Sequence, residues 1–217
     1  MANENKFPSE IIDLPSGGKV YGKDSPLKDG KIEIKYMTAK EEDILTSANL
    51  IKKGLVIDTL LNSLILTDGV KSDDLILGDK NAVMVASRVL AYGSEYTAEM
   101  TNPKGGGTVE HTFNLADCPF KELPKDVDYS KNEFEFELPV TKSKVVFKLL
   151  TGVEEKIIDK EMESLEKAGM PAPITTRLRH SIVSINGSAD TGEITNSVNN
   201  MLSRDSLALR AEMTRIT

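Results

Sequence analysis

The stretch from Leu14 to Leu64 constrains the fold most, because it encodes a turn, a strand and a helix start in a fixed order. The Pro-Ser-Gly-Gly run at 15–18 predicts a turn, since Pro fixes φ and Gly permits positive φ. In Ile-Glu-Ile-Lys-Tyr at 32–36, apolar and charged residues alternate, which is typical of a half-buried strand. Thr38 and Glu41 then form a capping box, the signature of a helix N-terminus.

Helical periodicity continues beyond the capping box. The apolar spacing predicts two helices joined at Gly54 and ending near Asp68-Gly69, an arrangement known as an αα-hairpin. Asp79 is expected to cap a third helix that runs through Tyr92 and stops at Gly93. The inward positions of these helices are Ile44, Leu45, Ala48, Ile51, Ile57, Leu60, Leu61, Leu64 and Ile65, followed by Ala82, Val83, Ala86, Val89 and Leu90.

After residue 94 the pattern changes to the period of two that strands require. Residues 95–101 and 108–115 predict a β-hairpin around the glycine-rich turn at 102–107. Phe and Leu alternate with Glu over 133–138, so this segment and 145–150 predict a second hairpin with one acidic, solvated face.

Helices are expected in the last third of the chain. Thr151 and Glu154 form another capping box, which opens a helix through Lys167. Shorter helices are expected around residues 175–184, 193–203 and 205–215.

These elements predict an α+β fold with a helical N-terminal platform after a short β-hairpin, an antiparallel β insertion and a helical C-terminal segment. We divide the chain into residues 1–93, with an arm, the hairpin and three helices, residues 94–150, which form the β-rich insertion, and residues 151–217, which form the C-terminal helical region. Residues 1–13 are expected to be a flexible arm.

Composition excludes several classes of partner. Lys and Arg total 27 against 34 Asp and Glu, giving a net charge of −7, so neither nucleic acid nor a membrane surface is an expected partner. The polar N-terminus lacks the apolar core of a signal peptide, and no apolar run approaches the roughly 18–20 residues that span a bilayer. A single cysteine excludes an intramolecular disulfide and favours a reducing compartment.

Motifs for catalysis or for ligand binding are missing. His111 and His180 lie beside no nucleophile motif, and Cys118 is expected to be a buried, unreactive thiol. The glycines at 105–107 follow a lysine and precede a strand, unlike a phosphate-binding loop. We therefore expect no enzyme activity, no catalytic residue, no cofactor and no metal site.

At two places the predicted helices have more apolar residues than one buried face would use. The stripe of the helix pair is broad around residues 55–64, and the terminal helix is apolar on both sides. Packing in the core is the competing interpretation at both places. The candidate partner-binding residues are Leu55, Val56, Leu60, Leu64, Leu207, Leu209, Met213 and Ile216.

A set of short motifs in a fixed order resembles the baseplate hub proteins of T-even-like phages with contractile tails. The resemblance covers most of the chain, and the order and spacing of the motifs carry it. The matching residues are Leu14-Pro15-Ser16, Gly18, Tyr21, Ser25-Pro26-Leu27, Gly30, Met37-Thr38, Glu41, Ile44-Leu45, Gly54, Leu60-Leu61-Asn62, Arg88 to Gly93, Glu95-Tyr96, Leu138-Pro139, Leu149-Leu150-Thr151, Asp205-Ser206 and Leu209-Arg210.

This resemblance implies a non-enzymatic protein needed for assembly of the baseplate hub, a structural subunit that contacts other tail proteins such as the hub or tape-measure protein. It also implies a location in the host cytoplasm during assembly and in the virion tail afterwards. The alternative is a transient assembly chaperone that is absent from the finished particle. Two rivals from other classes are a small hub-associated enzyme and a generic regulatory binding module.

Related proteins can carry paired cysteines, as in a small zinc ribbon, in the hairpin after the Gly93 step. This chain has no cysteine at 100–105, and a zinc ribbon needs four ligands. We expect a degenerate ribbon without zinc, held by strand pairing and by apolar contacts of Val109, Phe113 and Leu115.

Overall fold

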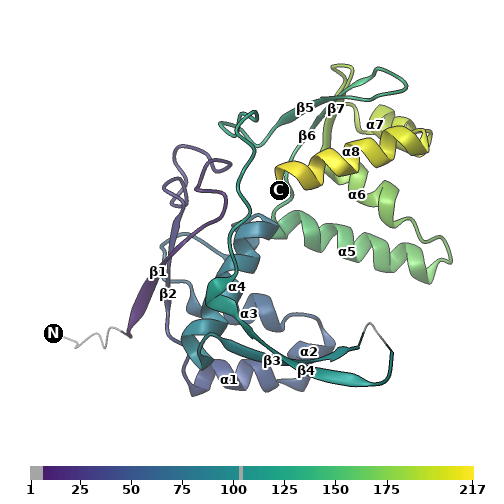
Figure 1. The fold of residues 1–217 in the computed structure, drawn as a ribbon. Coiled ribbons are helices and arrows are strands. Elements are labelled where there is room, and N and C mark those ends of the chain that lie inside the picture. The colour runs from purple at the N-terminus through teal and green to yellow at the C-terminus, as the bar shows by residue number, and fades with distance from the viewer. Residues whose placement is uncertain (1–6, 103–104) are drawn as a thin grey trace.

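The structure is a computed structural model that describes residues 7–102 and 105–217. Within these residues the chain forms eight α-helices and seven strands in three separate antiparallel sheets, which confirms the α+β class. Two clusters of buried hydrophobic side chains form the interior. One lies mainly in the N-terminal half and the other mainly in the C-terminal half, and the halves meet where α4 (Leu77–Tyr92) and α5 (Gly152–Lys167) begin (Figure 1).

A strand lies within residues 1–13, where a flexible arm was expected. β1 (Ser9–Asp13) pairs antiparallel with β2 (Lys31–Lys35), in a register that places Ser9 opposite Lys35. The residues of β1 do not alternate between buried and exposed positions, since Ile11 is exposed, the adjacent Ile12 is half-buried and none is fully buried. The strand therefore forms because β2 offers it an edge. The first six residues of the expected arm lie outside the described residues.

The expected helix pair is divided into three helices. The predicted box of Thr38 and Glu41 opens α1 (Ala39–Thr46), but the chain leaves the helical conformation at Ser47. The short α2 (Ala48–Lys52) follows, and then α3 (Val56–Leu64). Apolar side chains from β2, α3 and α4 close the N-terminal core, namely Ile32, Ile34, Leu61 and Val83 together with Leu14, Leu27 and Leu75.

Asp79 does not cap α4, because Ile76 occupies the N-cap position. The Asp79 carboxylate is fully buried and accepts three hydrogen bonds from the loop between β1 and β2. The backbone N–H and the hydroxyl of Ser16 donate to it at 2.9 and 2.6 Å, and the Tyr21 hydroxyl donates at 2.6 Å. Tyr21 also accepts a bond from the Ile76 N–H at 3.2 Å. Burial, and next the charge of Asp79, raises the pKa of the Tyr21 phenol above its usual range.

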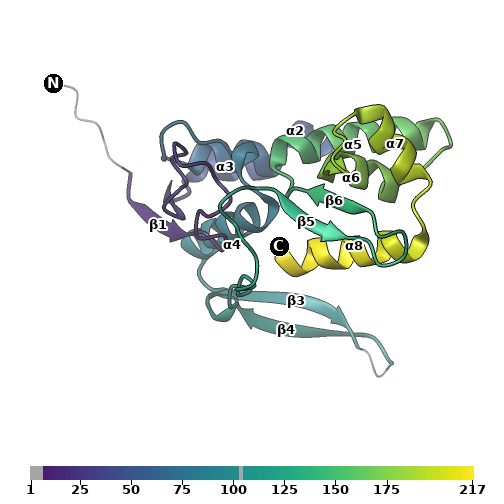
Figure 2. The ribbon, with the colours of Figure 1, turned by 90° about the horizontal axis from the view of Figure 1, so that it is seen from above.

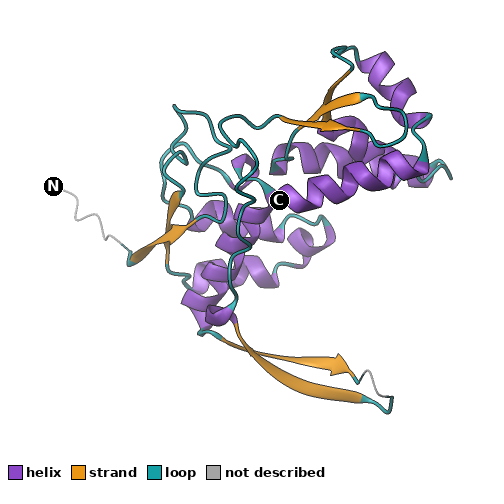
Figure 3. Cartoon of the chain, turned by 45° about the horizontal axis from the view of Figure 1, so that its top comes forward, coloured by secondary structure: helices purple, strands orange, loops and turns teal. Residues whose placement is uncertain are grey.

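The first predicted hairpin forms with nearly the expected bounds. β3 (Glu95–Thr101) and β4 (Thr108–Asn114) pair along their full lengths, and the turn residues Pro103 and Lys104 lie outside the described residues. A 3₁₀ turn, η2 (Leu115–Asp117), follows. The hairpin projects from the end of α4, away from both halves (Figure 3).

The second hairpin belongs to the C-terminal half, so segment 94–150 does not form one β unit. β5 (Phe134–Glu137) pairs with β6 (Lys144–Phe147), and β6 pairs with β7 (Ile182–Ile185). A helix was expected where β7 lies. Instead α6 (Pro173–Ser181) stops at Ser181, and the buried Ile182 and Ile185 extend the sheet. The remaining helices are α7 (Thr191–Asn199) and α8 (Ser203–Ile216).

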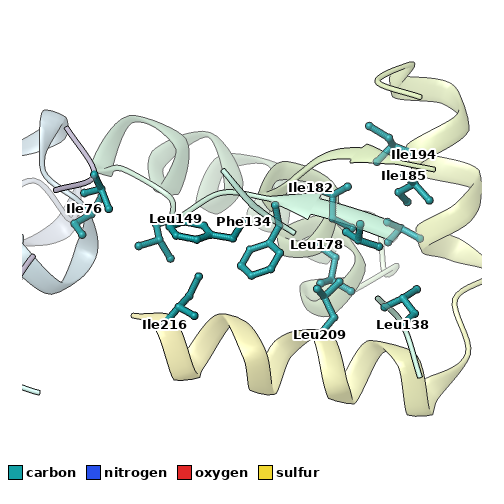
Figure 4. Packing of buried hydrophobic residues seen from close by; sticks show 14 of the residues in the cluster. Ile76, Phe134, Leu138, Leu149, Leu178, Ile182, Ile185, Ile194, Leu209 and Ile216 are labelled. Carbon is teal, nitrogen blue, oxygen red and sulfur yellow. The ribbon is translucent and has the colours of Figure 1, made fainter. Parts of the chain in front are cut away.

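Helix α8 lies along this sheet and closes the C-terminal core (Figure 2). Leu209 and Ile216 point from α8 towards Phe134, Leu149 and Leu178 (Figure 4). The end of α8 is also held by the segment between η2 and β5. In that segment Lys121 Nζ donates to Thr214 O at 2.6 Å, and the Tyr129 hydroxyl donates to Ile216 O at 3.1 Å.

The two halves are joined through α5. The Gly152 N–H donates to Leu75 O at 3.1 Å, and Lys156 Nζ lies 2.9 Å from Asp58 Oδ2 and 2.6 Å from Asp73 Oδ2. A Cβ at Gly152 would lie 2.8 Å from Asp73 Cα, so only glycine permits this close approach. The Gly152 hydrogen bond and the Lys156 ion pairs thus connect α5 to elements far from it in sequence.

Replacing Asp79 with alanine should lower the free energy of unfolding by about 3 kcal/mol or more, because two buried donors and one partly buried donor lose their acceptor. Tyr21→Phe, which removes one of these donors, should cost about 1–2 kcal/mol. Urea unfolding followed by circular dichroism measures both changes. An Asp79→Ala protein as stable as the parent would contradict this role.

Glu41 predicts a pH dependence of stability. Burial favours a raised pKa, but hydrogen bonds from Thr38 and Lys35 outweigh it and hold the pKa of Glu41 at about 2, below its usual 4.5. The stabilisation from Glu41 is therefore complete above pH 4.5 and is lost as the pH falls towards 2.

Glu41→Gln should cost about 1–3 kcal/mol at neutral pH and should flatten the decline of stability over this acidic range. Urea midpoints measured at several pH values test this expectation. The exposed neighbour substitution Glu42→Gln is the matched control, and an equal effect of both substitutions would refute the assignment.

Candidate partner-binding surfaces

The residues considered for chemistry lie on separate elements. His111 lies on β4, with its ring 4.5 Å from that of Phe113. On α6, His180 Nε2 lies 2.8 Å from Glu161, and the hydrogen bonds from His180 and Arg179 lower the pKa of the Glu161 carboxyl. Cys118 follows η2 and is exposed, which corrects the expectation of a buried thiol. No group of three or more His, Cys, Asp or Glu among the described residues is placed to hold a metal ion.

Half of the first set of candidate partner-binding residues are interior. Leu60 and Leu64 are buried, because they lie on the face of α3 that packs inward. Leu55 is 40 % exposed and Val56 is half-buried. Ile51 and Ile57 are exposed as well, so the turn between α2 and α3 presents an apolar surface, hereafter the α2–α3 turn surface, made of Ile51, Leu55 and Ile57.

The second set divides in the same way. Leu209 and Ile216 are buried in the C-terminal core, and the half-buried Met213 packs against it. Leu207 is 61 % exposed on the opposite side of α8. In the isolated chain, therefore, only Leu207 of this set lies fully open to a partner.

An apolar cavity of about 530 Å³ lies between α4 and the segment that follows η2. The sequence assigned one inward face to α4, but the helix has two. Val83 enters the core, whereas Ala82, Val85 and Val89 line the cavity; Ala86 contacts both. Its opposite wall contains Pro119 and Phe120, and the C-terminal residue Thr217 also lines it. The sequence alone could not predict this cavity, because residues far apart in the chain form its walls.

The β3–β4 hairpin was not predicted as a contact surface, although its alternation was visible. Four apolar side chains of one face, from 38 % to 51 % exposed, are Tyr96, Met100, Val109 and Phe113. Val109 and Phe113 were expected to hold an insertion together. Both side chains are instead exposed to solvent, so no other part of the described chain covers this apolar face of the hairpin.

The α+β body thus carries exposed apolar side chains at the α2–α3 turn, on α8 and on the β3–β4 hairpin. Comparison with protein families identifies its class as a bacteriophage tail protein. The family model described as the T4 bacteriophage base plate protein matches residues 8–168, which is more than half of the 217-residue chain. The chain therefore belongs to this baseplate family, and the predicted resemblance is confirmed at the level of the baseplate.

The matched range begins one residue before β1 and ends one residue beyond α5. The searches of curated proteins and of solved structures found no match. Among the residues that the structure describes, no helix is long and apolar enough to cross a membrane.

Two leucines of α8 test which side of the helix is exposed to solvent. Leu207→Ala should change the free energy of unfolding by about 0.5 kcal/mol or less, because the side chain is mostly solvated. Leu209→Ala should cost about 2–5 kcal/mol, because it leaves a cavity in the core. Chemical denaturation of the two variants measures the difference, and equal losses would show that α8 is packed differently.

Proposed function

We infer that the protein is a non-enzymatic structural subunit of the baseplate hub in a contractile tail, which acts by contact with other tail proteins. Membership of the baseplate family supports the setting. The observation that carries the proposal is the exposed apolar surface on three elements, the β3–β4 hairpin, the α2–α3 turn surface and α8, while two closed cores hold the body together.

A subunit role fits the distribution of exposed and buried groups. Capping boxes, partly buried ion pairs and a buried carboxylate fix the body, so its surfaces are presented with little conformational freedom, which lowers the entropic cost of binding. The hub and tape-measure proteins are the partners we propose. Assembly would take place in the host cytoplasm, before the protein enters the virion tail.

A second candidate function is a transient assembly chaperone. The cavity beside α4 favours it, because an apolar groove of this kind could hold a segment of a partner that is later released. A chaperone of this kind would leave the tail before the particle is complete.

Mass spectrometry of purified particles distinguishes the two functions. We expect peptides of this protein in a fixed ratio to other baseplate subunits, in particles that have been washed with high salt. Their absence from infectious particles would overturn the subunit proposal and favour the chaperone.

The same particles test the contacts. Leu55→Asp with Leu207→Asp should lower the yield of complete tails severalfold in a complementation assay, because the charges disrupt apolar contacts. The matched control places the same charges at exposed polar positions, Asn49→Asp on α2 and Ser203→Asp on α8, and should assemble normally. An equal loss of tails in this control would show that added charge, and not the lost apolar contact, is responsible.

A further inference from the structure

The β3–β4 hairpin has an open edge. Its seven residue pairs run from Glu95↔Asn114 to Thr101↔Thr108, and within the described residues the sheet has only these two strands. A two-stranded ribbon is marginally stable by itself and presents unpaired backbone groups along both edges. Every residue of β4 is exposed, whereas β3 has one half-buried position.

The ladder indicates which backbone groups of β4 face outward. At its two ends, Leu115 N–H donates to Ser94 O at 2.8 Å and Asn102 N–H donates to Gly107 O at 3.1 Å. Hydrogen-bonded and non-hydrogen-bonded pairs alternate in an antiparallel ladder. The residues of β4 whose backbone groups point away from β3 are therefore Thr108, Glu110, Thr112 and Asn114.

The two faces of the hairpin differ in chemistry. One is the apolar face of Tyr96, Met100, Val109 and Phe113. The other is polar and acidic, and on it Glu99 lies directly opposite Glu110. Like charges in opposed positions destabilise a strand pair. The strands of the hairpin contain three glutamates and neither lysine nor arginine.

These features together specify one kind of occupant. We propose that the outer edge of β4 accepts, as a third strand, an extended segment of another tail protein in which apolar and basic residues alternate. The backbone of that segment pairs with the outward groups of β4. Its apolar side chains extend the apolar face, and its lysines or arginines lie beside the glutamates of the other face.

Exposure favours β4 over β3, because every residue of β4 is exposed, and charge favours a different protein over a second copy. Two of the three glutamates lie on β3, but the Arg88 guanidinium, 5.8 Å from the Tyr96 ring centroid and 4.8 Å from that of Tyr92, places a positive charge at the start of β3. Two copies of this hairpin would bring two sets of glutamates together, in a chain of net charge −7.

The inference rests on the proposed role in tail assembly and names the partner chemistry for one surface. A synthetic peptide tests it without particles, so its failure is distinguishable from failure of the subunit proposal, which depends on mass spectrometry of virions. The probe is a capped seven-residue peptide of alternating lysine and valine, and it is titrated into the full chain at low salt with amide NMR as the readout.

We expect shifts and slowed amide exchange at Thr108, Glu110, Thr112 and Asn114, and at least about tenfold weaker binding of two control peptides. The first control alternates glutamate and valine, and the second has the original composition with its lysines in one block. Equal binding of the block peptide, or shifts confined to the α2–α3 turn surface or the cavity, would overturn the proposal. Self-association of the free chain through the hairpin in sedimentation would overturn it as well.

Substitutions in the hairpin test whether the peptide binds at the outer edge of β4. Thr112→Pro removes an outward N–H but no ladder bond, and it should weaken binding about tenfold or more. Thr112→Val keeps the N–H and loses only the hydroxyl that bonds to Thr97 at 2.8 Å, so it should bind within about twofold of the parent. Glu99→Gln with Glu110→Gln should weaken binding severalfold and reduce its salt dependence.

Thr97→Pro makes the equivalent change on the outer edge of β3 and should leave binding intact. If Thr97→Pro abolishes binding and Thr112→Pro does not, the assignment to β4 is wrong. Cross-strand contacts in the NMR spectrum of each proline variant show whether the hairpin is still formed, and the glutamate variant tests the proposal independently of any change in backbone.

Discussion

The buried Asp79 carboxylate is the interaction on which the N-terminal half depends. It binds the turn at Ser16 and the phenol of Tyr21, which draws the long loop between β1 and β2 onto the start of α4. Burying a charge is costly unless donors surround it, and here three donors do so. The loop is itself closed by a backbone contact that only glycine permits, since a Cβ at Gly18 would lie 2.4 Å from Gly30 N.

The hydrogen bonds around Asp79 and Tyr21 also connect to the C-terminal half. Tyr21 accepts the Ile76 N–H, and both Val20 and Ile76 belong to the C-terminal core cluster. Beside them, Leu75 O accepts the Gly152 N–H at the start of α5. The beginning of α4 is therefore a common support for both cores. The family match covers β1 to α5, and helices α6–α8, which lie beyond it, contribute Leu178, Ile194 and Leu209 to the C-terminal core.

Local signals in the sequence predicted local structure well. The capping boxes of Thr38 and Thr151 mark helix starts as predicted, and the alternation over 95–101 and 108–115 corresponds to strands with nearly the predicted bounds. The helix that Thr38 opens nevertheless ends at Thr46, well before the break predicted at Gly54. The role of Asp79 was missed because an Asp near a helix start has the same signature whether it caps the helix or accepts bonds from a distant loop. Likewise, no local pattern reveals that Ser181 ends a helix so that β7 can join β6.

Burial of the candidate binding residues could not be predicted for a related reason. Leu207 and Leu209 lie on opposite sides of α8, and the sequence says that both sides are apolar but not which one meets the sheet. The tertiary structure decides, and it assigns one side to the core and leaves the other to solvent. The β3–β4 hairpin is the extreme case, because neither face is covered by the body. An uncovered, two-faced ribbon on a rigid support fits the proposed role in tail assembly, because a partner strand with alternating basic and apolar side chains would pair with its open edge and cover its apolar face.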